Sequence, residues 1–161
     1  MNTSATVISI SEPVPENVLQ ALESVCDPEI PVLTIRDLGI LRGVRMKNGE
    51  VVVTITPTYS GCPAMVDIRD SIETALEDAG VEQFSIETSL SPAWTTDWMS
   101  EEGRKKLNEY GIAPPSQNNQ VACPQCGSDD TRLISEFAST ACKSLHQCNS
   151  CKEPFDYFKC H

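Results

Sequence analysis

The sequence has no apolar run long enough to cross a bilayer and carries little positive charge. A membrane-spanning helix needs about 20 consecutive apolar residues, and no hydrophobic stretch approaches that length. The 161 residues include 12 Lys and Arg against 23 Asp and Glu, a net charge of −11. An anionic surface repels nucleic acid backbones and anionic lipids, so we expect neither nucleic acid nor a membrane as partner. A protein partner with a basic face is a better match.

The N-terminal segment lacks the features of a secretory signal. Residues 1–16 contain no basic segment followed by an apolar core. We therefore expect a cytoplasmic protein, and this expectation guides the interpretation of the eight cysteines. In a reducing compartment, clustered cysteines bind metal or carry out chemistry more often than they form disulfides.

Histidine is scarce as well. The two histidines, His146 and His161, both lie after residue 140, so none is available near the cysteines of the first two thirds of the chain. The sequence also contains no nucleotide-binding or phosphate-binding motif. Both absences count against a thiol enzyme, because a nucleophilic cysteine usually has a histidine as its base.

The distribution of cysteine and charge predicts two domains. Six of the eight cysteines lie after residue 120, and the polar, proline-led segment 114–120 precedes them. Residues 1–115 carry 8 basic against 18 acidic residues, whereas residues 116–161 carry 4 against 5. The predicted organisation is a first domain at 1–115, a linker at 116–120 and a small second domain at 121–161.

Hydrophobic periodicity predicts an α-β-β-α-β-α order for the first domain, an α+β fold with helices packed on a small sheet. Asn48-Gly49 is the expected turn of a hairpin, because both residue types tolerate a positive φ. The predicted helices cover 15–25, 63–79 and 100–110, and the predicted strands cover 38–46, 51–56 and 84–90.

Two C-x-x-C motifs define the second domain: Cys123 with Cys126, and Cys148 with Cys151. Two intervening residues let one tight turn direct both thiolates at one ion, and the 21 residues between the motifs suit a hairpin. The expected S₄ site suits Zn²⁺ or a rubredoxin-like iron. A closed four-coordinate site predicts a structural role in a zinc-ribbon-like β domain whose folding is coupled to metal binding.

Four further potential ligands lie in the same domain: Cys142, His146, Cys160 and His161. They could form a second metal site or exchange a ligand during metal transfer. Neither pair has a familiar ligand spacing, so ordinary core or surface positions are the favoured interpretation.

In the first domain, Cys62 precedes Pro63 at the start of a predicted helix. A helix N-terminus stabilises a thiolate, and the hydroxyls of Thr58 and Ser60 could donate to the same anion. A buried cysteine that packs as a small apolar residue is an equal alternative.

An acidic segment, Asp27-Pro28-Glu29, lies before the predicted hairpin, and Asp37 lies between this segment and the hairpin. Turn and capping chemistry alone would explain these three carboxylates.

These motifs resemble those of two related families. Three segments are similar to the family of SufT and the eukaryotic cytosolic iron–sulfur targeting protein, a resemblance that covers about residues 16–112: Asp27-Pro28-Glu29, Asp37-Leu38-Gly39 and residues 58–63. Other segments resemble the PaaD family of the phenylacetyl-CoA ring-epoxidase system: residues 94–104, 111–115, 139–143, 148–151 and 153–155.

The resemblance implies an accessory factor rather than an enzyme. Such a factor would help to insert iron–sulfur clusters, or iron, into a client enzyme of aerobic phenylacetate degradation. The resemblance assigns the reactive cysteine to Cys62 and the acidic motif to Asp27 and Glu29; Thr58 would then stabilise the thiolate, and Asp37 would help to shape the loop beside it.

The implied clients are the ferredoxin-type reductase subunit or the di-iron oxygenase subunit of the epoxidase, with iron–sulfur assembly proteins as further partners. A [2Fe–2S] or [4Fe–4S] cluster takes four cysteines, so a transient cluster at Cys62 would need a homodimer, an outside thiol or a donor protein. The alternative function is a small electron carrier with iron in the four-cysteine site.

Overall fold

The computed structural model describes residues 13–59, 61–116, 118 and 120–159. Two compact units are present, Met1–Ser100 and Glu101–His161. They divide before the predicted linker at 116–120, because the short strand β4 (Ile112–Ala113) already pairs with strand β7 (Pro154–Phe158) of the ribbon. Separate folding of the segments 1–115 and 121–161 stays a prediction.

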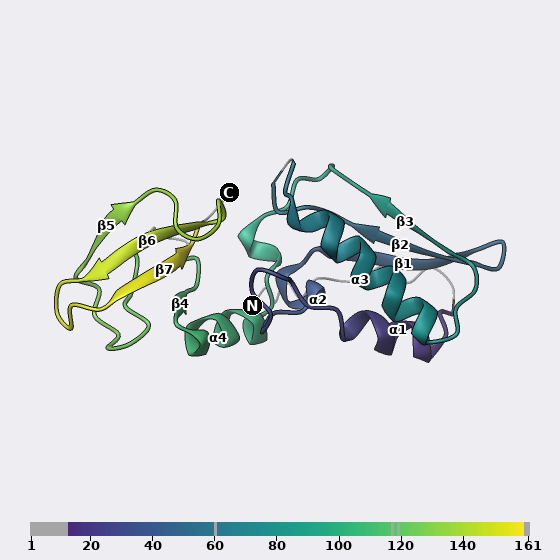
Figure 1. Ribbon diagram of the computed structural model, residues 1–161, viewed down its shortest axis with the longest axis horizontal. Coiled ribbons are helices and arrows are strands. Elements are labelled where there is room, and N and C mark those ends of the chain that lie inside the picture. The colour runs from purple at the N-terminus through teal and green to yellow at the C-terminus, as the bar shows by residue number, and fades with distance from the viewer. Residues whose placement is uncertain (1–12, 60, 117, 119, 160–161) are drawn as a thin grey trace. The chain divides into compact units, whose positions relative to one another are not determined.

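The first unit contains a three-stranded sheet in the order β1-β2-β3, with helices α1 and α3 packed against each other (Figure 1). β1 and β2 form an antiparallel hairpin, while β2 and β3 run parallel and are joined through α3. Its elements are α1 (Glu16–Glu23), α2 (Ile35–Leu38), β1 (Leu41–Lys47), β2 (Glu50–Ile55), α3 (Ala64–Asp78), β3 (Phe84–Thr88) and the 3₁₀ turn η1 (Thr96–Trp98).

The hairpin and the core of this unit follow the sequence pattern. Asn48 and Gly49 have positive φ values of 52° and 80°, as a type I′ turn requires. Helix α3 buries Ile68, Ile72 and Leu76 at the predicted helical spacing. Burying an aliphatic side chain of this size stabilises the fold by about 1.5–3 kcal/mol. The predicted α+β fold is confirmed.

The predicted strand start at Leu38 is wrong, because a capping box makes this segment helical. The Oγ1 of Thr34 accepts the N–H of Asp37 at 3.0 Å, and the Oδ2 of Asp37 accepts the N–H of Thr34 at 3.2 Å. Gly39, with a φ of 78°, ends this helical turn. The local bonds outweigh the β-propensity of the segment, and the strand begins at Leu41.

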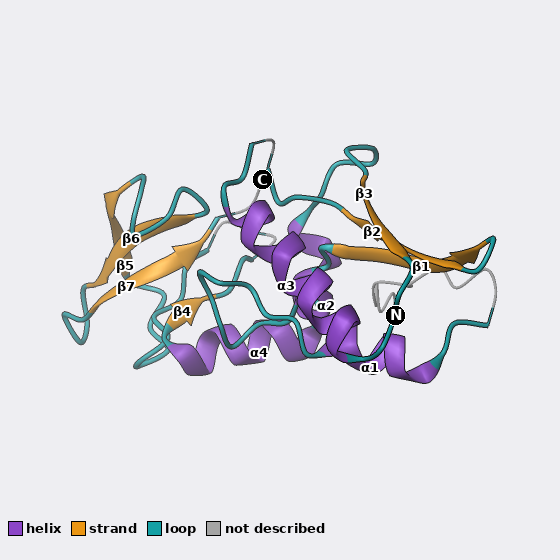
Figure 2. Ribbon diagram, turned by 45° about the vertical axis from the view of Figure 1, so that its right-hand side comes forward, coloured by secondary structure: helices purple, strands orange, loops and turns teal. Residues whose placement is uncertain are grey.

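The second unit contains α4 (Glu101–Tyr110) and a four-stranded sheet in the order β4-β7-β6-β5 (Figure 2). Strands β5 (Thr131–Ser135), β6 (Lys143–Cys148) and β7 are antiparallel neighbours, which confirms the predicted β ribbon. Its small core consists of Ala113, Cys123, Cys148, Phe155 and Tyr157. A core of this size rarely stabilises a fold without a metal or disulfides.

Across the described ranges of both units, no helix is both long enough and apolar enough to span a bilayer.

Candidate functional site

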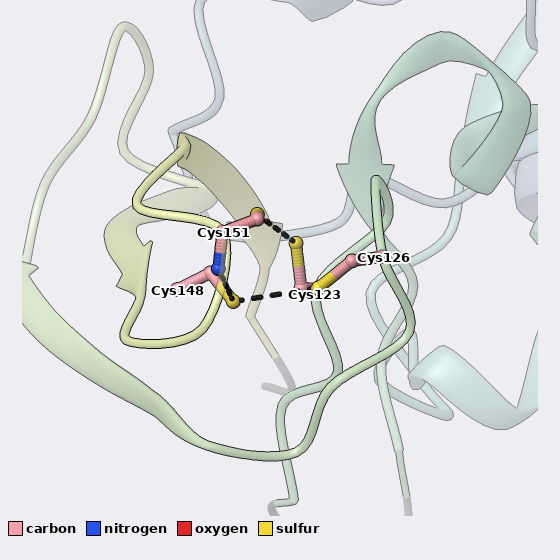
Figure 3. Close-up of side chains that lie close together, drawn as sticks. All are labelled: Cys123, Cys126, Cys148 and Cys151. Atoms are coloured by element: carbon pink, nitrogen blue, oxygen red, sulfur yellow. Dashed lines mark hydrogen bonds between the residues drawn. The ribbon is translucent and has the colours of Figure 1, made fainter.

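The four cysteines of the two C-x-x-C motifs come together in the ribbon (Figure 3). Their Sγ atoms all lie within 4.8 Å of one another. The Sγ of Cys123 is 3.7 Å from that of Cys151, and the Sγ of Cys126 is 3.6 Å from that of Cys148. A tetrahedral site with metal–sulfur bonds of about 2.3 Å has sulfur–sulfur edges of roughly 3.8 Å. This cysteine quartet therefore fits a four-coordinate metal ion.

The two motifs position their thiols with the same backbone pattern. The N–H of each first cysteine, Cys123 and Cys148, donates to the carbonyl five residues later, at 2.9 and 3.0 Å. The residue after each motif, Gly127 and Lys152, donates its N–H to the carbonyl of the first cysteine, at 2.8 and 3.0 Å. Both residues have a positive φ, 77° and 70°. Each motif is thus a tight loop of the kind that holds two thiols toward one ion.

Thiol ionisation differs strongly within the second motif. The N–H of Cys151 donates to the Sγ of Cys148 at 3.4 Å. This bond is the main reason that the pKa of Cys148 is lowered to about 6, against the opposing effect of burial. The pKa of Cys151 is raised to about 12: the backbone of Glu153 lowers it, but burial and the neighbouring thiols outweigh that effect. Without metal, the fold therefore favours the thiolate form at Cys148 over that at Cys151.

None of the cysteines in the described part of the chain forms a disulfide. The quartet is also the one group of three or more described Cys, His, Asp or Glu side chains that lie close enough to hold a metal. Cys142 lies outside it: this side chain is buried, and its Sγ is 3.0 Å from the Oγ1 of Thr140. Cys160 and His161 lie outside the described residues. Among the described residues, no further metal-ligand side chains lie close enough to Cys142 to complete a second metal site.

His146 lies on β6 among aromatic side chains. Its ring stacks on Phe155 with 5.9 Å between centroids and meets the ring edge of Tyr157 at 5.4 Å. Its Nε2 is 3.0 Å from the Oγ of Ser144. Burial lowers the pKa of His146, while the charge of Glu136 opposes this effect. His146 is half-buried, and its described contacts are with neighbours inside the ribbon; its role beyond these contacts stays a prediction.

Cys62 lies at the N-terminus of α3, as predicted. Pro63 is the N-cap residue, and the carbonyl of Cys62 accepts the N–H of Met65 at 3.2 Å. The side chain of Cys62 is half-buried, and no hydrogen bond between described residues engages its thiol. Thr58 is also half-buried, and Ser60 is not among the described residues. Stabilisation of a thiolate by Thr58 stays a prediction.

The carboxylates of Asp27 and Asp37 both accept hydrogen bonds from nearby residues of their own segments or loops. The Oδ1 of Asp27, which is buried, accepts the N–H groups of Glu29 and Ile30 at 2.7 and 3.0 Å. Asp37 caps α2, and its Oδ1 accepts the hydroxyl of Ser100 at 3.1 Å. Glu29 is half-buried. The turn and capping chemistry is thus present, and a further role of these carboxylates beside the reactive cysteine stays a prediction.

Sequence reasoning missed the polar bonds that join the two metal-binding loops. The hydroxyls of Ser128 and Ser150 are 2.9 Å apart, and the amide of Asn149 donates to the carboxylate of Asp130 at 2.8 Å. These bonds hold the loops together independently of the sulfur atoms. Their one signal in the sequence, small polar residues within or just after a C-x-x-C motif, is too common to be specific.

Comparisons with known proteins cover both units. Residues 109–159 match the family model of the PaaD zinc beta ribbon domain, and residues 15–87 match the model described as iron-sulfur cluster assembly protein. A crystal structure of a domain of unknown function, DUF59, from Bacillus anthracis is 28% identical, with a TM-score of 0.51. The match covers 56% of this chain and 87% of that one.

Two curated relatives extend this result. A protein of Porphyromonas gingivalis (strain ATCC BAA-308 / W83), named "Fe-S protein maturation auxiliary factor", is 37% identical over 57% of this chain and 89% of its own length. A protein of Escherichia coli (strain K12), named as a putative subunit of 1,2-phenylacetyl-CoA epoxidase, is 47% identical over 94% of this chain and 96% of its own length. The similarity thus includes both units, and the chain belongs to the PaaD family, with an N-terminal region of the iron–sulfur cluster assembly type followed by a PaaD zinc ribbon.

Proposed function

We propose that this chain is an accessory maturation factor of the phenylacetyl-CoA epoxidase system, and that it assists insertion of an iron–sulfur cluster into a client subunit. The observation that carries this proposal is the half-exposed Cys62 at the start of α3, within the region 15–87 that matches the iron–sulfur cluster assembly family. Relatives named as Fe-S protein maturation auxiliary factors support the maturation role, and the relative named as an epoxidase subunit supports the pathway.

In this proposal, Cys62 ligates iron of the cargo cluster transiently through its thiolate. The helix N-terminus favours the anion, and Thr58 donates a hydrogen bond to it. A cluster takes four cysteines, so the remaining ligands come from the client, from a donor assembly protein or from a second copy in a homodimer. Asp27, Glu29 and Asp37 keep the neighbouring loops in place. The chain passes on cargo and does not turn over substrate.

The ferredoxin-type reductase subunit is the proposed client. A ferredoxin-type protein holds its iron as a cluster on cysteines, which is the cargo that a reactive thiol can pass on. The di-iron oxygenase subunit would need iron alone and is the second candidate client.

The quartet is proposed to hold zinc. Zinc supplies a cross-link between the two C-x-x-C loops, and the folded ribbon then contacts a partner. The same S₄ geometry also suits iron, which would make the protein red and redox-active, as the alternative of a small electron carrier requires. Elemental analysis of the purified protein distinguishes the two metals.

The test compares iron and acid-labile sulfide in the reductase subunit purified from four strains. These strains carry the native chain, no chain, Cys62→Ala or Cys26→Ala. Cys26 is a matched control, because it is the other half-buried cysteine of the first unit. We expect low iron and sulfide without the chain and with Cys62→Ala, and native levels with Cys26→Ala. A fully loaded reductase from the strain without the chain would refute the proposal.

A further inference from the structure

Two large aliphatic side chains of the first unit are exposed near the start of α3. Val66, in the first turn of α3, is 64% exposed, and Leu90, just beyond β3, is 63% exposed. Single exposed apolar residues are ordinary on protein surfaces, whereas adjacent ones mark interaction sites. The arrangement of α3 against β3 decides which description applies.

Hydrogen bonds between α3 and β3 place Val66 and Leu90 at the same end of the unit. The guanidinium of Arg69 donates to the Oγ1 of Thr88 and to the carbonyl of Ile86, both at 3.2 Å. Val66 lies three residues before Arg69, about 4.5 Å along the helix axis and on a neighbouring part of its surface. Leu90 lies two residues after Thr88, about 6.6 Å along an extended chain. Because α3 connects two parallel strands, it runs opposite to β3, and both steps point the same way.

Cys62 precedes α3 at the same end of the unit, directly before the N-cap residue Pro63. Pro63 has helical dihedral angles, a φ of −67° and a ψ of −25°, so the spacing of α3 extends back toward Cys62. The chain therefore enters α3 from Cys62 only two residues before the first helical residue, Ala64. Cys62, Val66 and Leu90 thus lie at the same end of the first unit, and we call these three residues, a half-buried thiol and two exposed apolar side chains, the anchor surface.

The charge around the anchor surface is negative. Asp67 and Asp70 are exposed on α3, and neither carboxylate has a hydrogen-bond or ion-pair partner among the described residues. Arg69, the basic residue of α3, is engaged by β3. Residues 1–100 carry 5 Lys and Arg against 15 Asp and Glu, a net charge of −10. This surface therefore favours a partner with apolar side chains flanked by basic ones.

We propose that the anchor surface is the docking site of the client. A cysteine-containing segment of the apo-client, with an aliphatic or aromatic side chain next to Lys or Arg, covers Val66 and Leu90 and brings its own cysteines to Cys62. The apolar contacts provide affinity, and Asp67 and Asp70 set the orientation. This inference rests on the proposed function and adds to it the chemistry of the partner and the place where it binds.

The ribbon offers a competing surface, formed by Leu133, Ile134 and Phe137, which are 50%, 47% and 65% exposed. The Nζ of Lys159 lies 4.2 Å from the centre of the Phe137 ring, so part of this surface is already covered. Ile134 lies at an irregularity in the pairing of β5 with β6, which opposes addition of a further strand at this edge. These residues serve as matched controls, because the same change of an exposed apolar residue to serine can be made there.

The experiment measures the dissociation constant between the full-length chain and the apo-reductase subunit purified from cells lacking this chain. The test variant is Val66→Ser with Leu90→Ser, and the control is Leu133→Ser with Ile134→Ser. We expect the test variant to bind at least about tenfold more weakly, because it loses two apolar contacts, and the control to stay within about twofold of native affinity. Asp70→Asn, four residues after Val66 on the same part of α3, should weaken binding at low salt and lose its effect at high salt, whereas Glu101→Gln should not. Tryptophan fluorescence during urea unfolding checks that the first unit of each variant remains folded.

Three results would overturn the inference: unchanged binding by the test variant, weaker binding by the ribbon control alone, or an altered oligomeric state of the test variant with unchanged client binding. The last result would assign the surface to a second copy of the chain. Failure of the proposed function has a separate signature, a fully loaded reductase in cells that lack the chain. If the reductase from those cells is short of iron and sulfide but the test variant binds with native affinity, only the docking site is refuted.

Discussion

At the scale of single residues, Gly39 is the position where the smallest substitution should have a large effect. A Cβ added there would lie 2.6 Å from the Cβ of Trp98 and 2.7 Å from its carbonyl oxygen, and the residue has a φ of 78°. Two of the atoms that the added Cβ would meet, the carbonyl oxygen and carbonyl carbon of Trp98, belong to the backbone, so a side-chain rotation cannot relieve the contact. The turn after α2 and the segment around η1 therefore fit together only with glycine at this position.

Gly39→Ala should lower the free energy of unfolding of the first unit by about 2–4 kcal/mol, from the positive φ and the contact with Trp98 together. Urea unfolding followed by tryptophan fluorescence measures this, since both tryptophans, Trp94 and Trp98, lie in the first unit. Gly49→Ala is the control, with a φ of 80° and nothing within 4 Å of an added Cβ. It should cost only about 1–2 kcal/mol. Equal losses in the two variants would show that contact with Trp98 is unimportant.

At the scale of elements, the cysteine quartet should determine whether the ribbon folds. Cys123→Ser removes one of four thiolates, so we expect loss of most tightly held zinc and unfolding of β5, β6 and β7. The urea transition reported by the tryptophans of the first unit should persist. Elemental analysis gives the metal content, and amide NMR signals of residues 131–158 report ribbon structure.

Cys142→Ser is the matched control for this substitution. Cys142 is also a buried cysteine of the ribbon, but it lies outside the quartet. About one zinc per chain should therefore remain bound. Stoichiometric zinc in the Cys123→Ser protein, or its loss from the Cys142→Ser protein, would contradict the assignment of the ligands.

Acid should release the metal from the ribbon. In the metal-free ribbon the pKa of Cys148 is lowered from 9.0 to about 6, so the contribution of this thiolate is present above pH 9.0 and is lost as the pH falls through about 6, whereas the raised pKa of Cys151 gives the opposite dependence. Protons compete with the metal for all four sulfurs, so zinc affinity falls in the same direction. A chromogenic chelator should detect little release near neutral pH and progressively more release as the pH is lowered. Zinc that stays bound in strong acid would be inconsistent with a four-thiolate site.

Most of these elements could be predicted because their signals are local. The Asn48-Gly49 turn, the apolar face of α3 and the two C-x-x-C motifs each depend on residues a few positions apart. Helix α2 depends on reciprocal bonds between Thr34 and Asp37 that outweigh the β-propensity of their neighbours. Strand β4 has two residues and pairs with residues 156–157, more than forty positions away, so no local pattern indicates it.

The candidate functional site could likewise be predicted only in part. Spacing alone identified the quartet, because a tetrahedral ion needs two ligands from each tight loop. The sequence also placed Cys62 at a helix start. It could not place Leu90 and Val66 at the same end of the unit, because this depends on the parallel pairing of β2 with β3 and on the bonds of Arg69.

At the scale of the whole molecule, the two units differ in charge and in the state of their cysteines. Residues 1–100 have a net charge of −10, whereas residues 101–161 carry 7 basic against 8 acidic residues, a net charge of −1. The first unit contains Cys62 near a helix N-terminus, and the second places four cysteines in a closed quartet. Cargo transfer suits the first arrangement, because an incoming client can reach a half-exposed thiol. Structural metal binding suits the second.

This division leads to a prediction about the complete epoxidase. A maturation factor is needed while its client is being loaded and not afterwards, so fully loaded epoxidase subunits should convert phenylacetyl-CoA in vitro without this chain. Subunits produced in cells that lack the chain should be inactive and short of iron, and adding the purified chain to the assay alone should not restore them. An electron carrier with iron in the quartet predicts the reverse, since its client would be fully loaded with metal but would lack an electron donor. Activity of loaded subunits that appears only when the chain is added, in proportion to its amount, would therefore assign the quartet to electron transfer and exclude maturation as the function.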